Sequence, residues 1–267
     1  MSMVLAVKLL LVPLLIWGIT LAGRRWGPTV GGWLSAFPIL SAPILFIIAV
    51  QHGTAFAASA ASSTLTAVIG NLAFGLGYAW GAARFSWGLS LLAGYAGYFA
   101  VVACLYWWTP PLLMAVPLVL GVLLIAPRLY PMSDVGPQAA PTRPANDLLW
   151  RMGSGVLLVL LVTQFSSALG PQLSGALAMF PMMAPVLAVF SHRHSGVAYA
   201  TRLLRGMVLG YYSFSVFCIA LVLALPATSL GIAFLIALGC AVLVQAISRV
   251  HLMRSRPPIA PELQRPV

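Results

Sequence analysis

Residues 27–45 read GPTVGGWLSAFPILSAPIL, and the phrase returns at residues 170–187 as GPQLSGALAMFPMMAPVL. The two copies share their spacing through Phe-Pro, and the second is one residue shorter before Ala-Pro. A proline inside an apolar helix removes a hydrogen bond and clashes with the preceding turn. Matching prolines in both halves therefore indicate that a proline-interrupted segment has been duplicated. In a membrane protein, paired interruptions of this kind favour a transport site between two halves.

The composition predicts an integral membrane protein. Hydrophobic residues make up 61% and charged residues 6% of the 267 residues, whereas soluble domains carry about 25% charged residues. The mean hydropathy is +1.02. The net charge of +11 comes from arginines at the ends of apolar segments, a pattern typical of orientation in a bilayer. We therefore expect the lipid bilayer as a partner, and no nucleic acid.

Hydropathy predicts an all-α polytopic fold of about nine transmembrane helices. Except for Lys8, the basic residues lie in the loops after odd-numbered helices or near those loops. This places the N-terminus outside and the C-terminus in the cytoplasm, in what we expect to be a bacterial inner membrane. Lys8 and the length of the first segment argue against a cleaved signal peptide. The predicted helices cover residues 3–22, 29–50, 55–82, 87–108, 111–129, 149–169, 172–190, 197–225 and 229–249.

In this topology the two copies of the motif cross the membrane in opposite directions. The chain is then two inverted four-helix repeats, residues 1–110 and 148–250. A connector helix and cytoplasmic linker (111–147) join them, and a Pro-rich, disordered tail (251–267) follows. A second echo supports the repeat, because Gly53-Thr54-Ala55-Phe56-Ala57 matches Gly196-Val197-Ala198-Tyr199-Ala200. Inverted repeats are a common construction of secondary transporters.

The interrupted segments leave two interpretations open. Carbonyls freed by a proline cannot face lipid, so they face a cavity, water or a neighbouring helix. They belong either to a broken helix that binds substrate or to a kink that improves packing. On the first interpretation, the prolines shape the site, serines offer neutral hydrogen bonds, and two arginines one turn apart guard the cytoplasmic mouth. The candidate substrate-binding residues are Ser35, Phe37, Pro38, Ser41, Pro43, Ser59, Ser62, Phe180, Pro181, Pro185, Arg202 and Arg205.

Structural roles that involve no substrate are alternatives for several of these residues. The small, hydroxyl-rich stretch around Ser59 and Ser62 also suits close helix packing. Arg202 and Arg205 also suit snorkelling to anionic headgroups. Three amides at membrane depth are expected to bond neighbouring helices rather than substrate: Asn71, Gln164 and Gln245.

All three acidic residues, Asp134, Asp147 and Glu262, fall in the linker or the tail. Ion-coupled transporters usually keep a carboxylate within the membrane, so carboxylate coupling is disfavoured. Coupling through His52, His192 or His194, exchange, and facilitation remain open. His192-x-His194 is a weak metal-site alternative, because no third strong ligand accompanies it. We predict no metal and no cofactor.

No catalytic motif is present, so an enzyme is disfavoured, although an intramembrane serine enzyme remains an alternative. The sequence favours a secondary carrier, exporter or facilitator that moves a small anionic or zwitterionic metabolite by alternating access. A non-catalytic membrane scaffold or assembly subunit is the other alternative. A homo-oligomer is left open.

Overall fold

The computed structural model describes residues 3–38, 41–108, 110–131, 148–150, 152–154, 156–157, 181 and 183–254. Within these residues the fold is all-helical and contains no strand. The helices follow the apolar segments of the sequence closely. They are α1 (Met3–Trp26), α2 (Pro28–Ser35), α3 (Ser41–His52), α4 (Thr54–Ala82), α5 (Trp87–Trp107), α6 (Leu112–Leu129), α9 (Met183–Ser195), α10 (Val197–Ala224) and α11 (Leu230–Arg254).

Five of the described helices are long and apolar enough to cross a membrane, as expected of an integral membrane protein. They include all of α4, α6 and α10 and most of α5 and α11. At about 1.5 Å per residue, the 29 residues of α4 reach well beyond the roughly 30 Å of hydrocarbon. Outward-facing Leu113 and Trp107 are 87% and 86% exposed, as suits a surface covered by lipid.

Two expectations about helix bounds need correction. The predicted helix 29–50 is divided into α2 and α3, because the chain leaves helical geometry around Phe37-Pro38. The last helix continues to Arg254 rather than ending at 249, so the first residues assigned to a disordered tail are helical. Of the predicted helix 149–169, the structure describes residues 149–150, 152–154 and 156–157, which are helical. Residues 158–169 and 172–180 lie outside the described residues.

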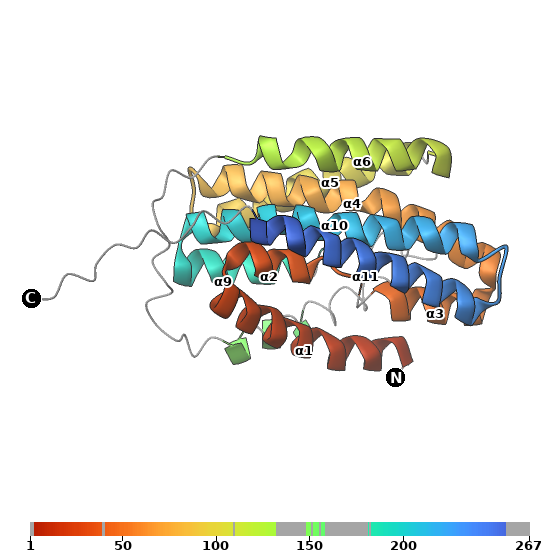
Figure 1. Cartoon of the computed structure of the whole chain (residues 1–267). Coiled ribbons are helices and arrows are strands. Elements are labelled where there is room, and N and C mark those ends of the chain that lie inside the picture. Colours follow the sequence, from red (N-terminus) through yellow and green to blue (C-terminus); the bar gives the residue numbers. More distant parts are fainter. Residues whose placement is uncertain are drawn as a thin grey trace, which may run out of the picture.

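Two long helices, α4 and α10, pack against each other at the centre of the bundle. α5 packs on α4, while α2 and α11 pack on α10, and α6 contacts both central helices. α1 contacts α2, α3 and α9. Figure 1 shows the short helices α3 and α9 at opposite ends of the bundle.

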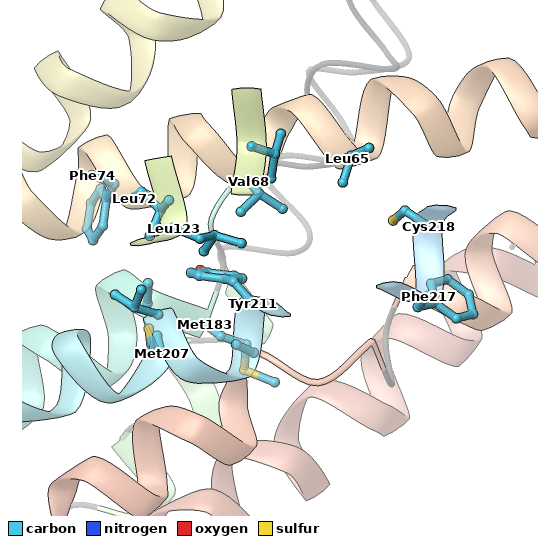
Figure 2. Packing of buried hydrophobic residues seen from close by; sticks show 14 of the residues in the cluster. Leu65, Val68, Leu72, Phe74, Leu123, Met183, Met207, Tyr211, Phe217 and Cys218 are labelled. Carbon is cyan, nitrogen blue, oxygen red and sulfur yellow. The ribbon is translucent and has the colours of Figure 1, made fainter. Parts of the chain in front are cut away.

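The core lies between α4, α10 and α6. Figure 2 shows Leu65, Val68 and Leu72 of α4 facing the side of Tyr211 and Cys218 of α10. α6 adds one buried stripe at helical spacing, formed by Ala115, Val119, Leu123 and Ala126.

Glycines set how closely the helices approach. A Cβ added at Gly77 of α4 would lie 2.6 Å from the Ala93 carbonyl oxygen, and one added at Gly97 of α5 would lie 2.9 Å from that of Ala73. Between membrane helices, packing replaces the hydrophobic effect as the driving force, so small residues of this kind allow the backbones to meet.

Candidate functional site

The interruption predicted at Phe37-Pro38 is present. α2 ends at Ser35 and α3 begins at Ser41. Ala36 turns the chain with φ −89° and ψ 0°, and Pro38 is buried between the two helices. Pro43 is the third residue of α3, where a missing N–H costs no intrahelical hydrogen bond. Pro38 therefore lies in the break, and Pro43 lies in the first turn that follows it.

The described part of the second copy has the same layout. Pro181 is buried and non-helical, α9 begins at Met183, and Pro185 is the third residue of that helix. Phe180 and the rest of the motif upstream of Pro181 lie outside the described residues.

The carbonyls at the end of α2 are bonded within the protein. The Ser35 hydroxyl donates to the Gly32 carbonyl oxygen at 2.7 Å. The Gln245 side-chain amide donates to the Trp33 carbonyl oxygen at 3.2 Å, and the Phe37 amide donates to that of Leu34 at 3.3 Å. These contacts favour a packing role for the first interruption, since three of its freed acceptors already have donors.

Gln245 belongs to a polar cluster that ties α2 to α11. The Trp33 indole N–H donates to the Ser248 hydroxyl at 2.8 Å, and that hydroxyl donates to the Gln245 carbonyl oxygen at 3.0 Å. We call these three residues the Trp33 cluster. The expectation that Gln245 bonds a neighbouring helix is confirmed. The part played by Trp33 was not foreseen, because nothing in the sequence pairs it with residues more than 200 positions away.

α2 is also seated directly on α10. A Cβ added at Gly32 would clash with the Leu203 carbonyl oxygen, one at Gly206 with that of Thr29, and one at Gly210 with that of Trp33. Gly206 and Gly210 form a small-x-x-x-small pair. The sequence analysis missed this pair, although its spacing is a known signature of tight membrane-helix packing.

A pocket of about 530 Å³ opens beside the interruption. Its wall is almost entirely apolar, and it brings together three of the predicted residues, Phe37, Pro38 and Pro43. The remaining lining comes from Ala42 and Phe46 of α3 and from Phe234 and Leu238 of α11. The other predicted site residues that the structure describes do not line this pocket: Ser35, Ser41, Ser59, Ser62, Pro181, Pro185, Arg202 and Arg205.

The hydroxyl-rich stretch lies in the first turns of α4. Ser59 is exposed and Ser62 is half-buried. The neighbouring hydroxyls bond their own helix: Ser63 donates to the Ser59 carbonyl oxygen at 3.2 Å, and Thr64 donates to that of Ala60 at 2.7 Å. Such bonds satisfy hydroxyls in an apolar setting without any partner from another element.

Arg202 and Arg205 lie in the second and third turns of α10. The Arg205 side chain is exposed, whereas Arg202 is half-buried. The Arg202 Nε is buried and has no hydrogen-bond partner among the described residues. Neither arginine can meet a carboxylate side chain there, because the described ranges contain no Asp or Glu.

His192 and His194 lie on helix α9, not on a loop as expected. Two residues apart on a helix, their side chains point to nearly opposite sides. His192 Nδ1 is 3.2 Å from the Tyr78 hydroxyl of α4, and His194 Nδ1 is 2.9 Å from the Phe190 carbonyl oxygen. Burial lowers the pKa of His192 below its ordinary value. The described residues hold no group of three or more metal-ligating side chains, and this histidine pair does not converge on one point.

Comparison with protein-family models, with curated proteins and with solved structures gave no significant match. Function is therefore inferred from the residues of this chain.

Proposed function

We propose that the protein is a membrane transporter built from two inverted repeats, which moves a small anionic or zwitterionic metabolite by alternating access. The observation that carries the proposal is the pair of short helices, α3 and α9, which both begin just after a Phe-Pro pair in the sequence. Discontinuous helices of this kind form the substrate sites of many secondary transporters.

The local backbone supports a repeated unit. Gly53, between α3 and α4, has φ 85° and ψ 166°, and Gly196, between α9 and α10, has φ 83° and ψ 171°. The long helices begin at Thr54 and Val197, a spacing of 197 − 54 = 143 residues. The same spacing of 143 separates Gly27 from Gly170 and Phe37 from Phe180. It also separates the start of α5 at residue 87 from that of α11 at residue 230.

The placement of the short helices supports an anionic or zwitterionic substrate. α3 has 12 residues and α9 has 13, and each begins after a Phe-Pro pair and ends directly before a positive-φ glycine. The N-terminus of a helix carries the positive end of its dipole, which favours a negative group. Arg202 and Arg205 would add positive charge near the cytoplasmic mouth, where a buried, unpaired Nε is available to an anion.

A non-catalytic scaffold remains the second candidate, because one observation favours it. The carbonyls freed at the end of α2 are bonded to Ser35, Gln245 and Phe37. A helix end satisfied in this way can serve packing alone.

The transport proposal is tested by anion flux in proteoliposomes. The double variant R202Q/R205Q should fold, because neutral polar groups are tolerated near a membrane surface, and it should lower anion flux. The matched control is R24Q/R25Q, which removes the same charge from the end of α1. Flux of cations only, or equal anion flux in wild type and R202Q/R205Q, would refute the anion assignment. Absence of any flux across a panel of solutes would favour the scaffold.

The inverted topology is tested separately. Reporter fusions at Gly170 and at Met253 should report opposite sides of the membrane. The same side for both would end the inverted-repeat proposal.

A further inference from the structure

We infer that the pocket beside the α2–α3 interruption binds one acyl chain of a bilayer phospholipid, which enters sideways between α3 and α11. The inference goes beyond the proposed transport function and does not depend on it, because it requires only the bilayer around the protein. The acyl chain would contact the apolar side chains beside the interruption, whereas the proposed anion would meet the N-terminal ends of the short helices.

The wall of the pocket selects hydrocarbon. Every lining side chain is apolar: two prolines, three phenylalanines, an alanine and a leucine. A polar or charged group inside would lose its hydrogen bonds to water and gain none from these side chains, which disfavours such a group in this pocket. The volume of about 530 Å³ lies within the range of roughly 300–1,000 Å³ found for small-molecule sites.

The pocket is continuous with the surface expected to face lipid. Phe46, on its wall, is 40% exposed. The neighbouring outward residues Val50 of α3 and Leu235 of α11 are 63% and 71% exposed. An acyl chain can therefore pass from the surrounding hydrocarbon into the pocket without crossing a polar surface.

The wall between the two helices is held by aromatic contacts. Phe46 of α3 meets Phe234 of α11 edge to face, with ring centroids 5.2 Å apart. Phe234 is in turn 6.3 Å from Phe217, a fully buried residue of α10. Edge-to-face pairs at these separations stabilise a fixed arrangement of the rings. The pocket is thus a formed site connected to the core of the bundle.

The interruption explains why space is left here. The Trp33 cluster holds α2 close to α11, whereas α3 starts a new helix after Pro38 with the small side chain of Ala42 in its first turn. Unfilled apolar space forfeits dispersion contacts. A chain supplied by the bilayer would restore them.

The test is photolabelling of the purified protein in nanodiscs that contain a phospholipid with a diazirine near the end of one acyl chain. Labelling of the segment from Phe37 to Phe46 should saturate at a low mole fraction of the probe, because a site fills, whereas contact with exposed faces should rise in proportion to the probe. L238W should fill the pocket and reduce labelling of this segment at least about fivefold. The matched control L243W enlarges an exposed leucine of the same helix and should stay within about twofold of wild type.

Folding of both variants is checked by thermal unfolding and size-exclusion profile. L238A is a second variant, for the case in which the tryptophan of L238W disturbs the fold. It enlarges the pocket, and its labelling should still saturate. Labelling that rises without saturation, or that L238W and L243W lower equally, overturns the inference. So does an oligomer whose interface covers α3 and α11 while the segment stays unlabelled, since a second copy of the chain would then be the occupant.

Discussion

The two glycine junctions, α3–Gly53–α4 and α9–Gly196–α10, share a backbone but carry different side chains. At the spacing of 143 residues, Ser59 and Ser62 correspond to Arg202 and Arg205. At the same spacing, Ser63 corresponds to Gly206, and Val102 corresponds to Gln245. The positions after the second junction thus hold two arginines and the glycine against which α2 packs, whereas the corresponding positions after the first junction hold small neutral hydroxyls. A few glycines and prolines maintain the similar backbone conformation of the two junctions. The side chains at the remaining positions can therefore differ in chemistry.

The largest expected effect is the difference in stability between a valine at Gly206 and a valine at Ser63. G206V places a branched side chain where the backbone of Thr29 already lies, so α2 cannot seat on α10. Overpacking of a core costs about 1–3 kcal/mol, and a backbone obstacle places this variant at or above that range. We expect loss of the monodisperse folded protein in mild detergent.

The matched control for G206V is S63V at the exposed position in the first unit. It should change stability by less than about 0.5 kcal/mol. A G206V protein as stable as S63V would mean that the seat of α2 does not depend on close approach.

The two junction glycines should behave alike. G53A and G196A each force a side chain into a positive-φ conformation that is nearly exclusive to glycine, at a cost of about 1–3 kcal/mol. A Cβ at either position meets nothing within 4 Å, so the backbone is the source of the cost. Thermal unfolding should show two losses of similar size. A large loss for one and none for the other would contradict the equivalence of the junctions. The control G239A, in a helix and with open space around it, should be neutral or stabilising.

The next prediction compares the stability and amide exchange of variants at Gln245 and at the corresponding residue Val102. Q245L removes the donor to the Trp33 carbonyl oxygen and leaves that acceptor buried, which should cost about 1 kcal/mol. Amide exchange of residues 34–37 should speed up in the same variant, because the end of α2 loses an anchor. V102L, a conservative change in the first unit, should leave both the unfolding midpoint and the exchange unchanged. Equal exchange in Q245L and wild type would show that the Trp33 cluster does not hold the interruption.

The smallest effect is a pH dependence at the contact between α9 and α4. Burial lowers the pKa of His192 from its ordinary 6.5, so the folded protein binds its proton less readily than the unfolded chain does. The stability that neutral His192 contributes is present above about pH 6.5 and is lost as the pH falls below that value and through the lower pKa of the folded state. The unfolding midpoint should drop between about pH 7.5 and about pH 5.5 less in H192Q than in wild type.

H194Q is the control for this effect, because His194 is exposed and bonds a carbonyl of its own helix. It should keep the pH dependence of wild type. An H192Q protein with unchanged pH dependence would show that His192 does not contribute to it.

Local signals in the sequence predicted the local structure well. Hydropathy located α4, α5, α6 and α10 to within a residue or two of their ends, and Phe37-Pro38 located the break, because proline acts on its own turn. The helical position of His192 and His194 was missed, since polar residues beyond an apolar segment read as a loop. The extension of α11 to Arg254 was missed for the same reason.

Partners across the fold could not be predicted. The apolar pocket needs both α3 and α11. The sequence alone suggested a site of prolines, phenylalanines, serines and arginines, and it could not show that α11 completes the wall around Phe37, Pro38 and Pro43. The seat of α2 on Gly206 likewise depends on which helices become neighbours. Spacing along one helix shows which residues share a face, and it does not show which helix that face meets.

The attachment of α2 to late-synthesised helices has a consequence for biogenesis. Trp33 and Gln245 are 212 residues apart in the chain, so the interrupted helix enters the membrane long before its binding partners are made. Until α10 and α11 are inserted, Gly32 and the Trp33 indole of α2 lack the partners that they have in the folded protein. A nascent chain stalled after α6 would therefore expose this segment to quality-control proteases, and the N-terminal half made alone should be degraded unless the C-terminal half is supplied in the same membrane.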